Sequence, residues 1–100
     1  MQHQDISPKQ KRQLRSQAHK LNPVVFIGKK AITENLVKQL QQDLGHHELL
    51  KIQISDDDRT KRAEIIDTLS KKTGAAIIQT IGKKAVLYKR GQENKYKIMA

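Results

Sequence analysis

The stretch VVFIGKKAITENL, residues 24–36, decides how this chain folds. Its first four residues are β-branched or aromatic and are followed by Gly28, which favours a strand covered on both faces of a sheet. Thr33 is a good helix N-cap, and the residues after it begin an apolar pattern at helical spacing. A strand, a tight loop and a helix in this order are typical of the start of a βαβ unit.

Before this stretch, the sequence predicts a basic helix over residues 8–19. Ser7 can cap a helix that has Pro8 in its first turn, and the pair Asn22-Pro23 prevents the helix from continuing. The apolar positions at helical spacing form a narrow stripe that consists of Leu14, Ala18 and Leu21. Most of the remaining helix surface is therefore expected to carry positive charge.

After the stretch, apolar residues continue at helical intervals and predict a helix over residues 33–44, which Gly45 would end. The segment LLKIQIS, residues 49–55, alternates between apolar and polar residues instead. Its apolar residues on one face are Leu50, Ile52 and Ile54. This alternation predicts a strand that is half exposed.

The last third of the chain predicts a helix and a hairpin. Asp56, Asp57 and Asp58 lie where a helix N-cap is needed, and apolar residues follow at helical spacing until Gly74. Residues 75–81 and 85–90 then have the composition of two strands, and the turn at 82–84 would join them as an antiparallel hairpin.

Together these elements predict an α/β fold within a single domain that spans residues 1–100. The order α-β-α-β-α-β-β implies a four-stranded mixed sheet with helices packed on it, mainly on one side. Residues 7–90 are expected to form the ordered core. Residues 91–100 alternate only weakly and are expected to form a tail.

The charge of the chain favours a polyanionic partner. Twenty Lys and Arg residues against ten Asp and Glu give a formal net charge of +10, and the pI of about 10.0 exceeds the usual mark for nucleic-acid-binding domains. A membrane surface is the competing polyanion. However, no apolar run approaches the roughly 18 residues of a membrane span, and no predicted helix sets bulky apolar residues opposite a basic face. RNA or DNA is therefore the expected partner, and no membrane interaction is expected.

The residues that the chain lacks narrow its chemistry. It contains no cysteine, which excludes disulfides and thiolate metal sites, and its first residues lack the apolar region of a secretion signal. Both features favour a cytoplasmic location. The aromatic residues are Phe26, Tyr88 and Tyr96. So few aromatic side chains weigh against recognition by stacking bases over a sheet and favour recognition of backbone and shape.

Two groups of residues are the main candidates for phosphate contacts. Gly28, Lys29, Lys30 and Ala31 lie just before a predicted helix N-terminus, where outward N–H groups and mobile ammonium groups favour an anion. Glu34 in the first turn would repel phosphate, so contact is expected nearer the two lysines. The second group, on and after the first helix, consists of Lys11, Arg12, Arg15 and Lys20. The alternative for either group is a solvated surface without a ligand.

Two further basic groups are secondary candidates for RNA contact. They are Arg59, Lys61 and Arg62 in the third helix, and Lys83 and Lys84 in the hairpin turn. The neighbouring aspartates lower the positive potential around the first group. Charged residues in a turn are expected for solubility alone, so both groups rank below the first helix.

No combination of residues indicates catalysis, a metal or a cofactor. His46 and His47 are adjacent, so their side chains diverge, and a position at the negative end of a helix is the simpler interpretation. Consecutive aspartates cannot all face one Mg²⁺ ion. The sequence also groups no nucleophile with a base and an orienting acid. We therefore expect a protein that is not an enzyme and holds neither metal nor cofactor.

Five segments, in the same order and at similar spacing, resemble the YhbY-type bacterial ribosome-assembly proteins, which consist of one CRM (chloroplast RNA splicing and ribosome maturation) domain. The segments are SPKQKRQLRSQAH at 7–19, LNPVVFIGKKAIT at 21–33, HHELLKIQI at 46–54, DDRTKRAEI at 57–65 and TGAAIIQTIGKKAVLYKR at 73–90. The resemblance implies a compact α/β fold that binds structured RNA. It also implies association with precursors of the large ribosomal subunit.

The family's GxxG loop, between the first strand and the next helix, corresponds to Gly28–Ala31, with alanine in place of the second glycine. If that position required a positive φ, alanine would cost about 1 kcal/mol. Charge at Lys29 and Lys30 would then matter more than close backbone approach. A KH domain places such a loop between two helices, and an RRM needs an aromatic-rich segment, so neither fits this sequence.

The hypothesis is a non-enzymatic RNA-binding factor that acts, as a monomer, on large-subunit ribosomal RNA in pre-ribosomal particles. Two alternatives stay open. One is a basic architectural protein for duplex DNA. The other is a protein-interaction module that docks an acidic partner or a ribosomal protein.

Overall fold

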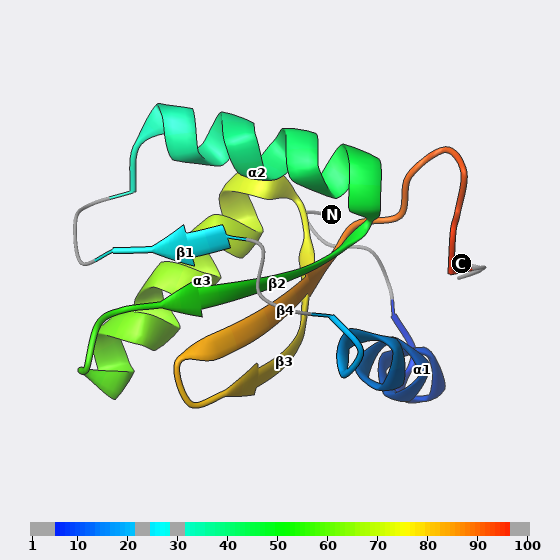
Figure 1. Ribbon diagram of the computed structural model, residues 1–100, viewed down its shortest axis with the longest axis horizontal. Coiled ribbons are helices and arrows are strands. Elements are labelled where there is room, and N and C mark those ends of the chain that lie inside the picture. Colours follow the sequence, from blue (N-terminus) through cyan, green and yellow to red (C-terminus); the bar gives the residue numbers. More distant parts are fainter. Residues whose placement is uncertain (1–5, 22–24, 29–31, 97–100) are drawn as a thin grey trace.

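Three helices and four strands follow one another in the predicted order in the computed structural model of the protein, which describes residues 6–21, 25–28 and 32–96 (Figure 1). The helices are α1 (Pro8–Ala18), α2 (Glu34–His47) and α3 (Arg59–Thr73). The strands are β1 (Val25–Ile27), β2 (Leu49–Ile54), β3 (Ala76–Ile81) and β4 (Lys84–Tyr88). The predicted α/β class and element order are confirmed.

The four strands form one mixed sheet in the order β1-β2-β4-β3. β2 pairs parallel with β1 and antiparallel with β4, and β4 pairs antiparallel with β3. β1, β2 and β3 therefore run in the same direction, and their carboxyl ends lie at the same end of the molecule, on the left in Figure 1. Gly28, Ser55 and the β3–β4 turn at residues 82–83 follow the strands there.

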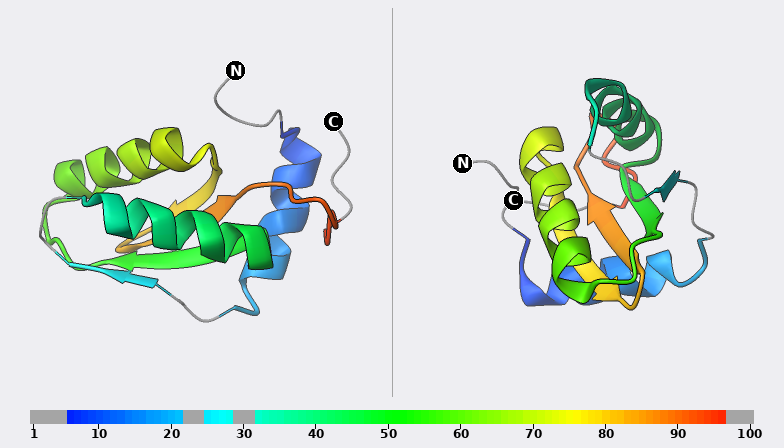
Figure 2. Two further views of the ribbon diagram at one scale, coloured as in Figure 1. Left: turned by 90° about the horizontal axis from the view of Figure 1, so that it is seen from above. Right: turned by 90° about the vertical axis from the view of Figure 1, so that its left-hand side faces the viewer.

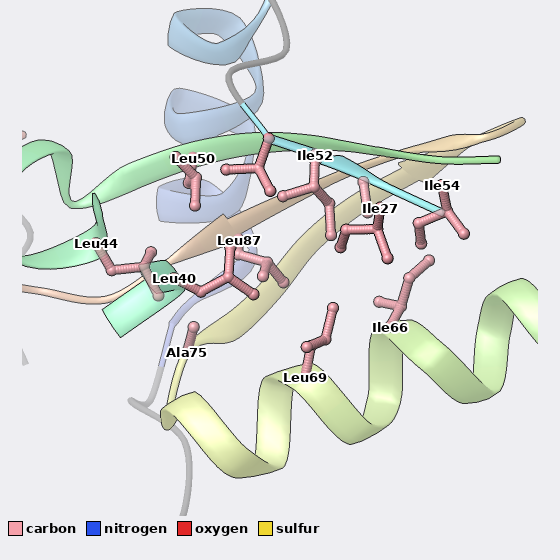
Figure 3. Close-up of a cluster of buried hydrophobic side chains, with 12 residues drawn as sticks. Ile27, Leu40, Leu44, Leu50, Ile52, Ile54, Ile66, Leu69, Ala75 and Leu87 are labelled. Carbon is pink, nitrogen blue, oxygen red and sulfur yellow. The ribbon is translucent and has the colours of Figure 1, made fainter. Parts of the chain in front are cut away.

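The main core lies between one face of the sheet and the helices α2 and α3. Figure 3 shows Ile66 and Leu69 of α3 directed toward the strands, where Ile52 and Ile54 of β2 face them. The alternation in β2 predicts this face correctly, because every second side chain of a strand points to the same side. The helix α2 adds Leu40 and Leu44 to the same core.

A second, smaller core lies on the opposite face of the sheet, where α1 packs. Leu14 and Ala18 of α1 are buried there together with Leu49, Val86 and Tyr88 of the sheet. Figure 2 shows α1 apart from the layer of α2 and α3. The prediction of helices mainly on one side thus holds for α2 and α3, while α1 covers part of the other side.

The predicted caps begin α1 and α3. Ser7 Oγ accepts a hydrogen bond from the Gln10 N–H (3.2 Å), and Gln10 Oε1 accepts one from the Ser7 N–H (2.9 Å), which makes a reciprocal capping box. At α3, Asp58 Oδ1 accepts from the Thr60 N–H (2.9 Å). Gly74 ends α3 in the left-handed conformation, with φ 77°. Local sequence therefore sets both ends of α3.

The predicted end of α2 at Leu44 is wrong. The helix continues through Gly45 to His47, and the residue that ends it is Glu48, with φ 62°. This conformation is unfavourable for a residue with a side chain. Glu48 is held in it because its carbonyl accepts from the Lys89 N–H (2.8 Å) and its carboxylate accepts from the Lys95 N–H (3.0 Å). Contacts with the distant carboxyl-terminal segment therefore stabilise the end of this helix.

The prediction that the first strand is covered on both faces is also wrong. β1 lies at the edge of the sheet. Val25 and Ile27 are buried in the main core, but Phe26 between them is 66% exposed on the opposite face. The helix α1 leaves this part of the sheet uncovered. An uninterrupted apolar run has therefore produced a half-exposed strand.

Residues 91–96 form no helix or strand, as a tail would, but they lie against the domain. The Gln13 side chain of α1 donates a hydrogen bond to the Tyr96 carbonyl (3.0 Å). The rings of Tyr96 and Tyr88 meet edge to face, with centroids 6.4 Å apart. The ordered core expected for residues 7–90 thus gains contacts from residues up to 96, and residues 97–100 lie outside the described residues.

The substitution Tyr88→Phe is expected to remove one cause of the fall in the free energy of unfolding at alkaline pH. Burial, reinforced by the charge of Glu48, raises the pKa of Tyr88 to about 12, and its hydroxyl has no hydrogen-bond partner in the described part of the chain. An unfolded tyrosine loses its proton near pH 10, so the folded state resists ionisation and stability falls as pH rises between about 10 and 12. The loss is up to about 1.4 kcal/mol per pH unit. The variant should lack this component.

Denaturant unfolding of the wild type and of Tyr88→Phe across this alkaline range measures the difference. At neutral pH the two free energies of unfolding should agree within about 1 kcal/mol, because the hydroxyl that is removed has no described partner. At higher pH the variant should become progressively more stable than the wild type. Parallel pH profiles for the two proteins would contradict the burial of an ionisable phenol at this position.

Candidate nucleic-acid interface

The first predicted site lies between β1 and α2. Gly28 is exposed at the end of β1, and Thr33 caps α2, since its Oγ1 accepts a hydrogen bond from the Leu36 N–H (3.1 Å). Glu34 is exposed in the first helical turn, as predicted. Residues 29–31, which include Lys29, Lys30 and Ala31, lie outside the described residues. The helix start next to this loop is thus as predicted, and the role of the loop stays a prediction.

The second predicted site is the basic surface of α1. Arg12 and Lys20 are exposed, and Lys11 and Arg15 are half-buried beside the stripe that contacts the sheet. Residues 8–18 include no Asp or Glu. Within residues 6–21, 25–28 and 32–96, none of these four side chains makes an ion pair or a hydrogen bond. Their positive charges are therefore not neutralised by these parts of the protein.

The secondary candidates divide into two kinds. Arg62 donates hydrogen bonds to the carbonyls of Asp56 and Asp57 (2.9 and 3.0 Å), and Lys83 forms an ion pair with the Asp57 carboxylate (2.6 Å). These two side chains hold the loop before α3 and the β3–β4 turn. The side chains of Arg59, Lys61 and Lys84 have no such partner among the residues described. The structure thus separates cations that stabilise loops from cations that can meet a ligand.

The position of Lys84 differs from the prediction. The sequence pattern places it in a turn, but it is the first residue of β4 and pairs with Ile81 and Gln53 of the neighbouring strands. The turn is shorter by one residue, because the ladder between β3 and β4 continues to Lys84. Its side chain therefore rises from the sheet.

Sequence reasoning missed a hollow between the end of α1 and the sheet. It has a volume of about 260 Å³ and is lined by Ala18, His19, Lys51, Gln79, Ile81, Lys84 and Val86. The Lys51 ammonium reaches from the sheet toward α1 and donates a hydrogen bond to the Leu21 carbonyl (3.0 Å). The alternation in β2 already indicates that Lys51 points away from the main core. The alternation does not indicate which elements lie beside Lys51. The order of the strands in the sheet determines that β4 adjoins it, with β3 beyond.

Two of these features, the basic helix α1 and the hollow, lie on the same face of the sheet, and Gly28 follows β1 toward the far end. Figure 1 shows α1 toward one end, the carboxyl ends of β1 and β2 toward the other, and the strands between them. The hollow lies on the face of the sheet that α1 occupies, since Ala18 and Val86 belong to the second core. The arrangement can offer phosphate groups several cations in sequence.

Neither a cluster of metal ligands nor a membrane-spanning helix is found among the described residues. No three His, Cys, Asp or Glu side chains come close enough there to hold a metal ion. His46 and His47 occupy the last turn of α2, as predicted for histidines near the negative end of a helix. In the same described residues, no helix combines the length and apolar character needed to cross a membrane.

Known proteins of similar sequence and structure share this domain. Residues 6–89 match the CRS1 / YhbY (CRM) domain. An RNA-binding protein of Haemophilus influenzae is 40% identical over 93 residues, which cover 93% of this chain and 94% of the relative. Probable RNA-binding protein YqeI of Bacillus subtilis is 37% identical over 90 residues, which cover 90% of this chain and 94% of YqeI.

A solved structure agrees. The solution structure of the hypothetical protein SAV1595 of Staphylococcus aureus, described as a candidate RNA-binding protein, has a TM-score of 0.79 and 38% sequence identity. The match covers 91% of this chain and 95% of that one. The resemblance carried by the five sequence segments is thereby confirmed. The chain belongs to the CRS1/YhbY (CRM) domain family.

Proposed function

We propose that this protein binds structured RNA without catalysing a reaction, and that the basic surface of α1 is its principal contact. The observation that carries the proposal is the group Lys11, Arg12, Arg15 and Lys20, whose charges meet no carboxylate within the described structure. Such a surface attracts phosphate groups over a distance of about one Debye length. The names of the relatives, which are those of RNA-binding proteins, support RNA as the polyanion.

The loop Gly28–Ala31 belongs to the same proposal. Gly28 follows β1 at the end of the sheet opposite α1 (Figure 1), and Thr33 caps the start of α2. Exposed Gly28 leaves room for an approaching phosphate, since no atom of the described residues outside its chain neighbours lies within 4 Å of an added Cβ there. Lys29 and Lys30 would supply the charge.

RNA affinity is expected to depend strongly on salt. If the two surfaces neutralise about four to six phosphates, the logarithm of the association constant should fall with the logarithm of salt concentration at a slope of roughly −3 to −5. Titration of a structured ribosomal RNA fragment at several salt concentrations measures the slope. A slope near zero would contradict an electrostatic contact of this size. Stronger binding to duplex DNA than to RNA at the same salt would favour the architectural alternative.

The proposed biological target is large-subunit ribosomal RNA in precursor particles, with the protein acting as a cytoplasmic monomer. Sedimentation of cell extract through a density gradient tests this target, because the protein should comigrate with precursors of the large subunit. Presence in mature or polysomal fractions alone would contradict an assembly role. Association that survives nuclease treatment would favour the protein-interaction alternative.

A further inference from the structure

Four residues from four strands form a row across the sheet. By strand register, Phe26 of β1 lies opposite Gln53 of β2, Gln53 lies opposite Lys84 of β4, and Lys84 lies opposite Ile81 of β3. Adjacent strands are about 4.8 Å apart, so the row extends over about 14 Å. The strand pairing brings together residues from both halves of the chain.

The row lies on the face that α1 only partly covers. Gln53 alternates with the core residues Ile52 and Ile54, so it points to the opposite side of the sheet. Ile81 and Lys84 line the hollow beside α1, and Phe26 is excluded from the main core that its neighbours enter. The four side chains therefore project from the same face.

Both ends of the row are apolar and exposed. Phe26 is 66% exposed and Ile81 is 59% exposed, and these are the large hydrophobic residues that the described structure leaves open to solvent. A single exposed apolar residue is ordinary on a protein surface. Here both belong to one row, with an amide and an ammonium group between them.

The charge around the row selects the kind of partner. The row carries no carboxylate, the Lys84 ammonium has no partner within the described residues, and Lys51 and His19 line the adjoining hollow. An apolar protein segment would match Phe26 and Ile81 but not these cations. A nucleic-acid strand matches both, because every base has an apolar face and every nucleotide carries a phosphate.

We propose that the row binds an unpaired stretch of RNA, about two or three nucleotides long, with one base stacked on Phe26. The Lys84 ammonium meets the phosphate beside that base, the Gln53 amide donates to or accepts from a base edge, and Ile81 packs against the next base or sugar. This inference rests on the proposed function and adds to it a subsite for single-stranded RNA. The small number of aromatic residues in the chain weighs against base stacking in general. This subsite needs only one ring, however, and Phe26 is exposed on an open face of the sheet.

Substitutions of Phe26 and two RNA probes test the subsite. The probes are a hairpin with a purine-rich unpaired loop and a fully paired duplex with the same number of phosphates. Phe26→Ala should weaken hairpin binding about tenfold and leave duplex binding unchanged within about twofold, because stacking contributes only where a base is unpaired. The salt dependence should stay the same, since no cation is removed.

A tryptophan at the same position gives an independent readout. The chain contains no tryptophan, so Phe26→Trp would place a single indole reporter in the row. Its fluorescence should be quenched by the hairpin and not by the duplex if a base stacks on the ring. Thermal unfolding of each variant shows whether the substitution has damaged β1. No damage is expected, because the Phe26 side chain is exposed.

The outcomes separate the subsite from the proposed function. If the wild type binds neither probe, the RNA-binding function and the subsite both fail. If the wild type binds both probes but Phe26→Ala keeps its hairpin affinity and Phe26→Trp is not quenched, the subsite alone fails. If Phe26→Leu keeps full affinity while Phe26→Ala loses it, again without quenching of Phe26→Trp, the position serves an apolar contact instead of stacking.

Discussion

Replacing Lys11, Arg12 and Arg15 together by glutamine is expected to lower the affinity for structured RNA about 100-fold at about 0.1 M salt. Each phosphate contact contributes about 0.7 to 0.9 to the slope of log affinity against log salt concentration. Because about 0.1 M lies one decade below 1 M salt, each contact raises the association constant at about 0.1 M by the same number of decades. Three contacts therefore account for about 2.1 to 2.7 decades, a loss of at least about 100-fold. The slope itself should become shallower by about two to three.

Structural damage is not the expected cause of this loss. In the described structure the three side chains make no ion pair or hydrogen bond that glutamine would break, and glutamine is a good helix former. The Ser7–Gln10 capping box also remains. The thermal midpoint of the variant should thus stay close to that of the wild type.

A matched control places the same change of charge on the other layer. Lys38 of α2 and Lys71 and Lys72 of α3 are exposed on the helices that cover the main core, and Lys71 forms an exposed ion pair with Asp67 (3.0 Å), which contributes little to stability. Replacing these three by glutamine lowers the net charge by the same amount but leaves α1 intact. RNA affinity should then fall by much less than in the α1 variant. Equal losses in the two variants would mean that net charge, and not the α1 surface, drives binding.

Local signals in the sequence predict most of the fold. Several helix ends are set by contacts between near neighbours in the sequence. The Ser7–Pro8 pair, the aspartates before α3 and Gly74 make such contacts, and each begins or ends a helix where predicted. The alternation in β2 fixes which side chains enter the main core, because the period of a strand is two. These features need no knowledge of the neighbouring elements.

The errors fall where distant residues decide the outcome. Gly45 has the composition of a helix end by itself, but the residue with positive φ is Glu48, whose hydrogen bonds come from Lys89 and Lys95. The exposure of Phe26 depends on β1 lying at the sheet edge. Neither the order of the strands nor the contacts of the last residues can be read from a local pattern.

The same distinction applies to the candidate interface. Basic residues are visible in the sequence, but their ion pairs are not, so that Lys83 and Lys84 look equivalent although one pairs with Asp57 and the other projects from the sheet. The row that begins at Phe26 depends on the register of three strand pairs. The charge of the interface is thus predictable, and its shape is not.

Replacing Leu14→Ala is expected to lower the free energy of unfolding by about 2 to 5 kcal/mol and to weaken RNA binding as well. Leu14 is fully buried, and with Ala18 it makes up the buried stripe that fixes α1 to the sheet. A helix of 11 residues is only marginally stable in water by itself. Loss of packing would therefore release α1 and disperse the cations it carries. If the docked form fell to about one tenth of the molecules, RNA affinity would fall about tenfold.

Leu69→Ala provides the comparison that separates the two effects. Leu69 is equally buried, but it belongs to the main core under α3, on the face of the sheet away from α1. Its loss should cost a similar free energy of unfolding while α1 stays in place. At a temperature where both variants are folded, Leu14→Ala should bind RNA more weakly than Leu69→Ala. Equal RNA affinities for the two variants would show that a docked α1 is not required for binding, because both variants lose comparable stability and only one loses the support of the basic helix.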